Sequence, residues 1–275
     1  MRTLIMLTTI AVAAAMAGGL FIYSGTYNVA ATAQHTAPIY WLLEDTMRRS
    51  VRQHAREIKV PKLDDPVSVE RGLSLYRQHC VQCHGAPGVT PDAYALGLSP
   101  LPANLAHTAR EWPPAELYWV VKHGIKMSGM PAWEFRLPED DLWAVVAFLQ
   151  VLPKLSPQQY HAMRPAGPED GSQRLRSSET AISPDVNRGR MALHQYACAT
   201  CHEIPGIVGA NVPVGPPLAR IATRGIIAGM LPNTPENMIR WLRAPQAVNP
   251  RTAMPDLGIP EHDARNIAAY LATLK

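Results

Sequence analysis

The four cysteines of this chain stand in two Cys-x-x-Cys-His patterns. These comprise Cys80, Cys83 and His84, and then Cys198, Cys201 and His202. On one helical turn, two thiols at this spacing can reach the two vinyl groups of one porphyrin, and the following histidine then lies beneath the iron. The spacing therefore predicts two covalently attached c-type haems, each with its motif histidine as the proximal iron ligand.

Two other uses of a Cys-x-x-Cys pair are alternatives: a thioredoxin-like redox dithiol and half of a zinc site. A redox dithiol does not require a histidine directly after its second cysteine. A zinc site would need the two pairs close together, whereas more than a hundred residues separate Cys83 from Cys198. All four cysteines fall in the two motifs, so none remains for a structural disulfide. The pattern therefore favours haem attachment over both alternatives.

Length and composition indicate about two small folded domains. The chain has 275 residues, of which 47% are hydrophobic and 17% charged, and this balance excludes a disordered protein. It has 3 Phe but 26 Pro, which suits small helical domains with Pro-rich loops, in which a porphyrin supplies part of the core. The net charge of +4 comes without a basic patch of interleaved aromatics, so no nucleic-acid partner is expected.

The N-terminus predicts a membrane element. Residues 4–23 form an apolar run of about 20 residues, long enough to cross the hydrocarbon core as a helix. A cleaved signal peptide usually has a shorter apolar region of about 7–15 residues, so we expect residues 1–25 to be an uncleaved transmembrane signal anchor. Arg2 is the only charge before Glu44, which places the N-terminus in the cytoplasm. Together with the site of haem attachment, this predicts a single-pass protein of the bacterial inner membrane with its haem domains in the periplasm.

A connector with an amphipathic helix is expected at residues 26–65. Apolar residues recur at helical spacing within 38–58, with arginines on the other side. Four aromatic residues are candidates for anchors at the outer membrane interface: Tyr23, Tyr27, Tyr40 and Trp41. Three roles for the helix stay open: contact with anionic headgroups, contact with a partner subunit, or a simple connection with a solvated face.

Beyond residue 66 the chain repeats itself. Gly72 precedes the first motif and Gly189 the second, each in a short predicted amphipathic helix that carries the motif at its end. A Pro-Glu pair opens a later predicted helix in each half, at 138–139 and at 260–261, which is ordinary helix-start chemistry. Residues 157–183 are rich in Pro, Ser, Gly and charge and indicate a linker.

These features resemble the class I cytochrome c family over about residues 66–156 and 184–275. The resemblance implies an all-α fold, in which an N-terminal transmembrane helix is followed by two tandem class I cytochrome c domains. In this family the first and last helices of a domain cross at a glycine. That implies close approach of Gly72 to the helix containing Phe148, and of Gly189 to the helix that ends near Tyr270.

The family completes its haem with a methionine from a loop late in the domain. Met130 and Met254 each precede a proline in the loop before the last predicted helix of their half. The resemblance therefore implies Met130 and Met254 as the sixth iron ligands, with Met127 as the alternative in the first domain. A histidine and a methionine make a low-spin, six-coordinate iron in which the soft sulfur favours the reduced state.

The resemblance also implies contacts around these ligands. A ligating histidine usually donates its second ring N–H to a carbonyl, and in this family a loop proline supplies it. Pro216 fits this role in the second domain. Pro102 is the candidate in the first domain, where the loop is less regular. Trp119 and Trp241 stand at the same offset in the two repeats, and each is expected either to contact haem propionates or to pack as a core aromatic.

Two filled axial positions suit an electron carrier or electron-transfer subunit rather than an enzyme, because oxygen and peroxide cannot readily bind. We expect electrons to arrive from a quinol-oxidising complex or another cytochrome and to leave for a terminal acceptor. Residues 231–237, 241–243 and 254–256 resemble the cytochrome c domain fused to the copper-bearing subunit of some haem–copper oxidases, which implies such an oxidase as acceptor. The main alternative is the electron-accepting subunit of a periplasmic dehydrogenase. A dihaem peroxidase is less favoured, since one of its haems must open a coordination site.

Overall fold

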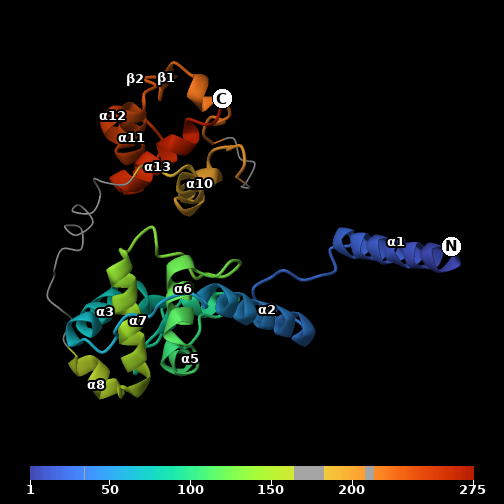
Figure 1. Ribbon diagram of the computed structural model, residues 1–275, viewed down its shortest axis with the longest axis vertical. Helices are drawn as coiled ribbons and strands as arrows, with labels where there is room; N and C mark the ends of the chain where they lie inside the picture. Colours follow the sequence, from blue (N-terminus) through green and yellow to red (C-terminus); the bar gives the residue numbers. More distant parts are fainter. Residues whose placement is uncertain (34, 164–182, 208–213) are drawn as a thin grey trace. The chain divides into compact units, whose positions relative to one another are not determined.

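The computed structural model describes residues 1–33, 35–163, 183–207 and 214–275 (Figure 1). It is mainly helical, with 56% of residues in helices and 2% in strands, so the expected all-α class is confirmed. Two compact units are present, Met1–Pro131 with Trp143–Pro165 and Ala132–Leu142 with Ala166–Lys275. The segment 132–142 groups with the second unit, although the sequence places it in the first domain, because Phe135 belongs to the second unit's apolar cluster.

The first helix, α1 (Arg2–Tyr23), matches the predicted membrane element. Among the described residues it is the one helix long and apolar enough to cross a membrane, and none of its residues is buried in the protein. At 1.5 Å per residue its 22 residues reach about 33 Å, which is sufficient for the hydrocarbon core. The helix is therefore compatible with a transmembrane anchor.

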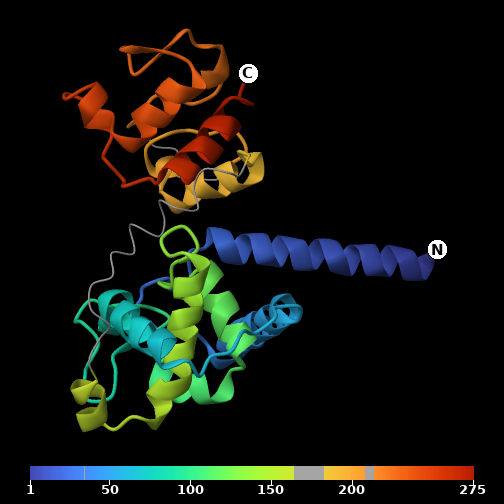
Figure 2. The same cartoon turned by 60° about the vertical axis from the view of Figure 1, so that its left-hand side comes forward.

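In the first unit, α3 (Pro66–His79) crosses α7 (Glu139–Val151), and Gly72 lies at the crossing (Figure 2). A Cβ on Gly72 would overlap the carbonyl oxygen of Ala144 and lie 2.8 Å from Cβ of Phe148, so the helices can approach this closely only at a glycine. Beside the crossing, the rings of Tyr76 and Phe148 pack with centroids 5.2 Å apart. The crossing fixes the point at which α3 delivers the first haem motif.

The remaining elements of this unit's haem domain are short. They are α4 (Val81–His84), η1 (Ala95–Gly97), α5 (Leu105–Glu111), α6 (Pro114–His123) and η2 (Leu152–Lys154). The α6 helix begins at Pro114, whose fixed φ suits a first turn, and it ends at His123, followed by Gly124 with a positive φ of 66°.

The predicted amphipathic helix exists as α2 (Ala37–Ala55), and it is more than a connector. Its C-terminal half packs against α6, where Val51 and Ala55 are buried. The ring of His54 lies 5.5 Å from that of Trp119 on α6. These contacts make α2 part of the first compact unit, which therefore includes residues before the expected domain start at residue 66.

The expected linker 157–183 starts with a folded helix, α8 (Pro157–Ala162). Ser156 and Gln159 form a capping box at its start, which satisfies two backbone donors reciprocally. Tyr160 is buried, and Arg77 of α3 donates to the carbonyl oxygens of Tyr160 at 2.7 Å and of Met163 at 3.2 Å. The prediction was therefore wrong for 157–162, because a cap and a buried aromatic hold these residues on the first unit. Residues 164–182 lie outside the described part of the chain.

The second unit repeats the helix crossing. A Cβ on Gly189 of α10 (Val186–Gln195) would overlap the carbonyl oxygen of Asn266 on α13 (Glu261–Leu271). The other elements are η3 (Cys198–Thr200), η4 (Ile221–Thr223), β1 (Ile226–Ile227), β2 (Leu231–Pro232), α11 (Pro235–Arg243) and α12 (Pro245–Val248). The two strands form an antiparallel pair in which Ile226 opposes Pro232.

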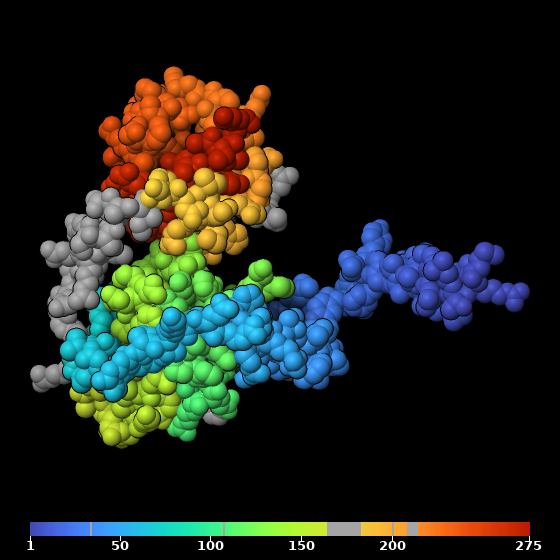
Figure 3. Space-filling model, viewed as in Figure 1, coloured from blue at the N-terminus to red at the C-terminus, as the bar shows by residue number. Residues whose placement is uncertain are grey.

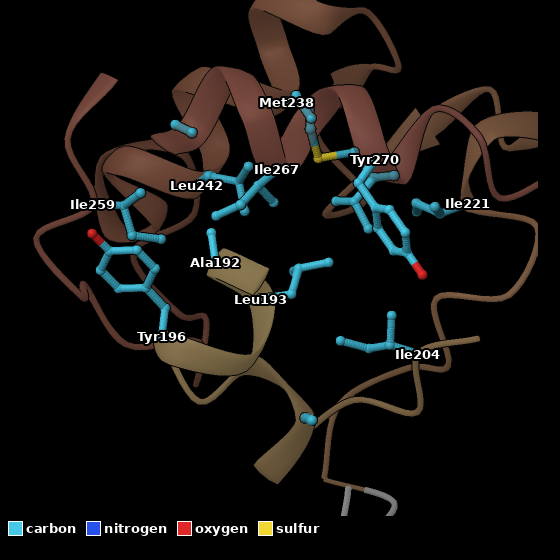
Figure 4. Packing of buried hydrophobic residues seen from close by; sticks show 14 of the residues in the cluster. Ala192, Leu193, Tyr196, Ile204, Ile221, Met238, Leu242, Ile259, Ile267 and Tyr270 are labelled. Atoms are coloured by element: carbon cyan, nitrogen blue, oxygen red, sulfur yellow. The ribbon is translucent and has the colours of Figure 1, made fainter. Parts of the chain in front are cut away.

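The core of this unit lies between α10, α11 and α13 (Figure 4). Leu193, Ile267 and Leu242 are almost fully buried within it. Asp263 of α13 is also fully buried. The hydroxyl of Tyr196 donates to Asp263 Oδ2 at 2.9 Å, and the guanidinium of Arg188 lies 3.5 Å from Oδ1. A buried carboxylate is tolerated when it is paired and hydrogen-bonded in this way, and the pairing joins α10 to α13.

Candidate functional site: two haem-attachment motifs

Each Cys-x-x-Cys-His motif forms a tight turn just beyond the unit's first helix. The backbone N–H groups of Cys83 and His84 both donate to the carbonyl of Cys80, at 3.1 and 2.9 Å. The second motif makes the same pair of bonds, to the carbonyl of Cys198 at 3.2 and 3.0 Å. The first motif begins at Cys80, the C-cap of α3, and the second begins at Cys198, shortly after α10 ends at Gln195. The turn carries two thiols and an imidazole at the predicted spacing, which fits one covalently held haem per motif.

The first cysteine of each motif has a raised pKa, unlike the reactive thiol of a redox dithiol. Burial raises the pKa of Cys80 to about 12, and the neighbouring Cys83 adds to the shift. Burial likewise raises the pKa of Cys198 to about 11. A catalytic dithiol needs the opposite, a depressed pKa that supplies thiolate at neutral pH. Among the residues the structure describes, no group of three or more His, Cys, Asp and Glu side chains that could hold a metal ion is found.

The two motif histidines are held through the same ring nitrogen. His84 Nδ1 donates to the carbonyl of Ala103 at 2.7 Å, and His202 Nδ1 donates to the carbonyl of Pro216 at 2.8 Å. In both rings Nε2 is then the nitrogen that can coordinate iron. Burial lowers the pKa of His84, partly offset by its bond to Ala103, and this favours the neutral imidazole that ligation requires.

The sequence identifies the correct carbonyl in one domain and misses it in the other. Pro216 supplies the oxygen in the second unit, where it was expected. Pro102 does not in the first unit, because Ala103 is the acceptor. The acceptor is the residue directly after the predicted proline, so the prediction missed it by one position. In the second unit Gly215 explains the fit, because a Cβ there would lie 2.5 Å from Cε1 of the His202 ring.

In the first unit, hydrogen bonds close the loop that carries Met130. The N–H of Ile125 donates to the carbonyl of Met130 at 3.2 Å, and the Met130 N–H donates to the Ser128 hydroxyl at 3.2 Å. The same hydroxyl donates back to the carbonyl of Ile125 at 2.7 Å. Met127 lies at the loop tip with a positive φ of 60° and is 88% exposed. The loop therefore fixes Met130 and leaves Met127 in solvent.

The loop of Met254 in the second unit is built in the same way. The Met254 N–H donates to the Thr252 hydroxyl at 3.1 Å, and Gln246 Nε2 donates to the Met254 carbonyl at 2.7 Å. A hydroxyl residue two positions before each methionine is thus shared by both repeats. Ser128 and Thr252 were not among the predicted site residues. Their shared position, two residues before each candidate methionine, could have indicated this role.

The two tryptophans predicted near the haems are both half-buried. Trp119 lies between the rings of His54 and His123, at 5.5 and 5.2 Å, on the side of α6 that faces α2. Trp241 packs against the apolar cluster of the second unit. These contacts account for both residues as packing aromatics, and a contact with haem propionates stays a prediction.

Comparison with known families assigns each unit separately. Residues 67–149 match the family model described as cytochrome C oxidase, cbb3-type, subunit III, and residues 186–275 match the model described as cytochrome c. The oxidase-type family model thus covers the first haem motif, and the cytochrome c model covers the second. Both matched ranges contain one complete motif and one candidate methionine.

Two characterised proteins are similar to parts of the chain. Cytochrome c oxidase subunit 2 of Alkalihalophilus pseudofirmus is 35% identical over 93 residues, which are 33% of this chain and 26% of that protein. Quinohemoprotein alcohol dehydrogenase of Comamonas testosteroni is 28% identical over 134 residues, 46% of this chain and 18% of that protein. The chain thus spans about a quarter or less of the length of these relatives. No solved structure matches it.

The family matches, the paired motif turns and the repeated helix crossings agree. Each unit supplies two thiols and a motif histidine whose Nδ1 is held by a loop carbonyl, which fits one covalently attached c-type haem. The two haems are covalently bound, and their iron serves electron transfer. The chain is therefore a dihaem cytochrome c, with two cytochrome c domains in tandem.

Proposed function

We propose that this chain is a membrane-anchored electron carrier that passes electrons through its two haems to a terminal acceptor, a haem–copper oxidase, as its subunit or its partner. The observation that carries the proposal is the same set of holding bonds in both units. Each motif histidine donates its Nδ1–H to a loop carbonyl, and each candidate methionine has its N–H fixed to a hydroxyl two residues earlier.

The residues of the chain keep both axial positions filled. We propose His84 and Met130 as the axial ligands of the first haem, and His202 and Met254 as those of the second. The thioethers formed by the four cysteines would hold each porphyrin in both oxidation states. When bound in this way, a haem supplies a one-electron couple with a raised potential. The protein's part is to hold the imidazole neutral, orient it, and deny small molecules a coordination site.

The anchor and the compartment belong to the same proposal. The apolar α1 and the absence of Asp, Glu, Lys and further Arg between Arg2 and Glu44 support a single crossing of the bacterial inner membrane. The haem units would then lie in the periplasm. Fractionation of native cells, followed by protease treatment of intact spheroplasts, tests this, because periplasmic units are digested while cytoplasmic ones survive.

Two observations support an oxidase as the acceptor. The first unit matches the model named for a cytochrome oxidase subunit, and the chain is similar to a cytochrome c oxidase subunit 2. A second candidate, electron transfer from a periplasmic dehydrogenase, is favoured by the likeness to a quinohemoprotein alcohol dehydrogenase. Purification from native membranes in mild detergent distinguishes the two candidate functions. An oxidase would co-migrate with the chain in the first case, and a dehydrogenase in the second.

The ligand assignment is tested by carbon monoxide. The reduced protein should not bind carbon monoxide at either iron, because a methionine occupies each sixth position. The oxidised protein should show a sulfur-to-iron charge-transfer band with the intensity of two haems. Appreciable carbon monoxide binding by the intact protein would refute the carrier proposal and favour a dihaem peroxidase.

A further inference from the structure

Near its N-terminal end, α2 has four consecutive large apolar residues that are exposed to solvent. Tyr40 is 59% exposed, Trp41 66%, Leu42 58% and Leu43 49%. Single exposed apolar residues are common on protein surfaces, but four in a row form a contiguous apolar patch. We call residues 40–43 the α2 tip. All four belong to α2 of the first unit, and Figure 3 draws residues of this part of the chain in blue.

The arrangement of the α2 tip around its helix limits what can cover it. Successive residues of an α-helix are about 100° apart, so four consecutive side chains occupy about 300° of the circumference. A flat protein surface or a groove covers one stripe of a helix, which would leave part of the tip exposed. A medium that surrounds the helix end-on covers all four side chains at once.

The C-terminal half of α2 is held on the first unit, so the helix cannot lie with its whole length along a surface. Val51 and Ala55 form its buried stripe against α6, and Arg52 is paired with Glu116 of α6 at 3.8 Å. The guanidinium of Arg48 lies 5.3 Å above the ring of Trp112. These contacts make α2 part of the first haem unit, so whatever holds the tip also orients that unit.

Polarity changes abruptly along α2, in the order that a membrane surface requires. No Asp, Glu, Lys or Arg occurs between Arg2 and Glu44, so the uncharged stretch continues from α1 through the tip. Directly after the tip the charges begin, and they are paired within the helix, Arg48 with Glu44 and Arg49 with Asp45, each at 2.7 Å. The helix begins at Ala37, so its residues through Leu43 rise about 10 Å, which matches the depth of about 5–10 Å that apolar groups reach at the headgroup boundary.

The chain between α1 and α2 brings the tip to the membrane. Thirteen residues, 24–36, separate Tyr23 from Ala37 and span at most about 45 Å when fully extended. We propose that the α2 tip inserts end-on into the headgroup region of a phospholipid bilayer, on the side where α1 ends, and thereby sets the orientation of the first haem unit. This inference rests on the proposed membrane anchor.

Site-directed spin labelling of the full-length, haem-loaded protein tests the insertion. The native cysteines are all consumed by haem attachment, so a single introduced cysteine takes the label. Leu42→Cys reports on the tip, and Gln53→Cys, exposed near the other end of the same helix, is the matched control. Val12→Cys reports on α1. The variants are placed one chain per phosphatidylcholine nanodisc, so that a second copy cannot cover the tip, and depth is measured from relaxation by oxygen and by a water-soluble nickel chelate.

The label at Leu42→Cys should lie about 5–10 Å below the headgroup surface, unchanged in high salt, while the label at Gln53→Cys should remain in water. A water-exposed label at 42 with a deep label at 12 would overturn the inference and leave the anchor standing. A label at 42 shielded from both relaxing agents would also overturn it, in favour of a protein contact. A water-exposed label at 12 would refute the anchor itself, and the inference with it.

Discussion

Gly215→Ala is the substitution for which the structure makes the sharpest prediction. The new Cβ would lie 2.5 Å from Cε1, 2.7 Å from Nδ1 and 3.0 Å from Nε2 of the His202 ring, so the whole edge of the imidazole is in the way. The backbone of Gly215 does not have a positive φ, so an alanine there is not strained by itself. The effect should come from the collision alone, because either the ring or the loop must move.

The loss of stability can be estimated from the clash between the new Cβ and the His202 ring. Ordinary carbon contacts begin near about 3.5 Å, so the ring must retreat by about 1 Å. Relief of such overpacking typically costs about 1–3 kcal/mol, and loss of the 2.8 Å bond from His202 Nδ1 to Pro216 adds about 1 kcal/mol. That bond makes His202 a more basic ligand, so its loss should raise the potential of the second haem and leave the first unchanged.

Redox titration and denaturant unfolding of the haem-loaded protein measure both effects. Gly225→Ala is the matched control, since it lies in the same unit and a Cβ there meets nothing within 4 Å. The control should unfold within about 0.5 kcal/mol of the parent and keep both potentials. If Gly215→Ala behaved like Gly225→Ala in both measurements, the contact between residue 215 and the His202 ring would be wrong.

Three further predictions concern the first unit. Met130→His should retain the covalent haem and lower its potential, on the order of 100 mV, because imidazole replaces a soft thioether; the same drop in Met127→His instead would show that the wrong methionine was assigned. Gly72→Ala should destabilise the unit by about 1–3 kcal/mol, because its Cβ meets backbone of α7, whereas Gly97→Ala, with open space around it, should be neutral in the same unfolding assay. Tyr160→Ala should cost about 3 kcal/mol on thermal unfolding, and an unchanged midpoint would mean that α8 is not packed on this unit.

The fold was predictable where short-range chemistry decides it. The Pro-Glu pairs place the starts of α7 and α13 at Glu139 and Glu261, and glycines mark both helix crossings. The capping box at Ser156 and Gln159 was also readable, but the high content of Pro and Ser in the following residues masked it. The packing of α2 on α6 could not be predicted from the sequence. An apolar stripe indicates that a helix packs against something, but it does not identify the partner.

The same division holds for the site. Thiols and imidazoles in one turn are fixed by sequence spacing, so the donor set of each haem motif could be proposed directly. The acceptor for His84 lies 19 residues away in an irregular loop, and only its three-dimensional course selects Ala103 over Pro102. The hydroxyls that fix the two methionine loops were present in the sequence, yet their role depends on a backbone turn that residue types alone do not specify.

The two glycine crossings also bear on the order in which the protein is made. In both units the haem motif leaves the ribosome more than fifty residues before the helix that closes over its leading helix, α7 in one and α13 in the other. When the motif first becomes accessible, the native packing of α3 or α10 does not yet exist. If haem were attached at that stage, the Cys-x-x-Cys-His motif would have to be recognised without the packed domain around it. The bound porphyrin would then offer an apolar surface on which the late helix packs, so that cofactor attachment precedes folding.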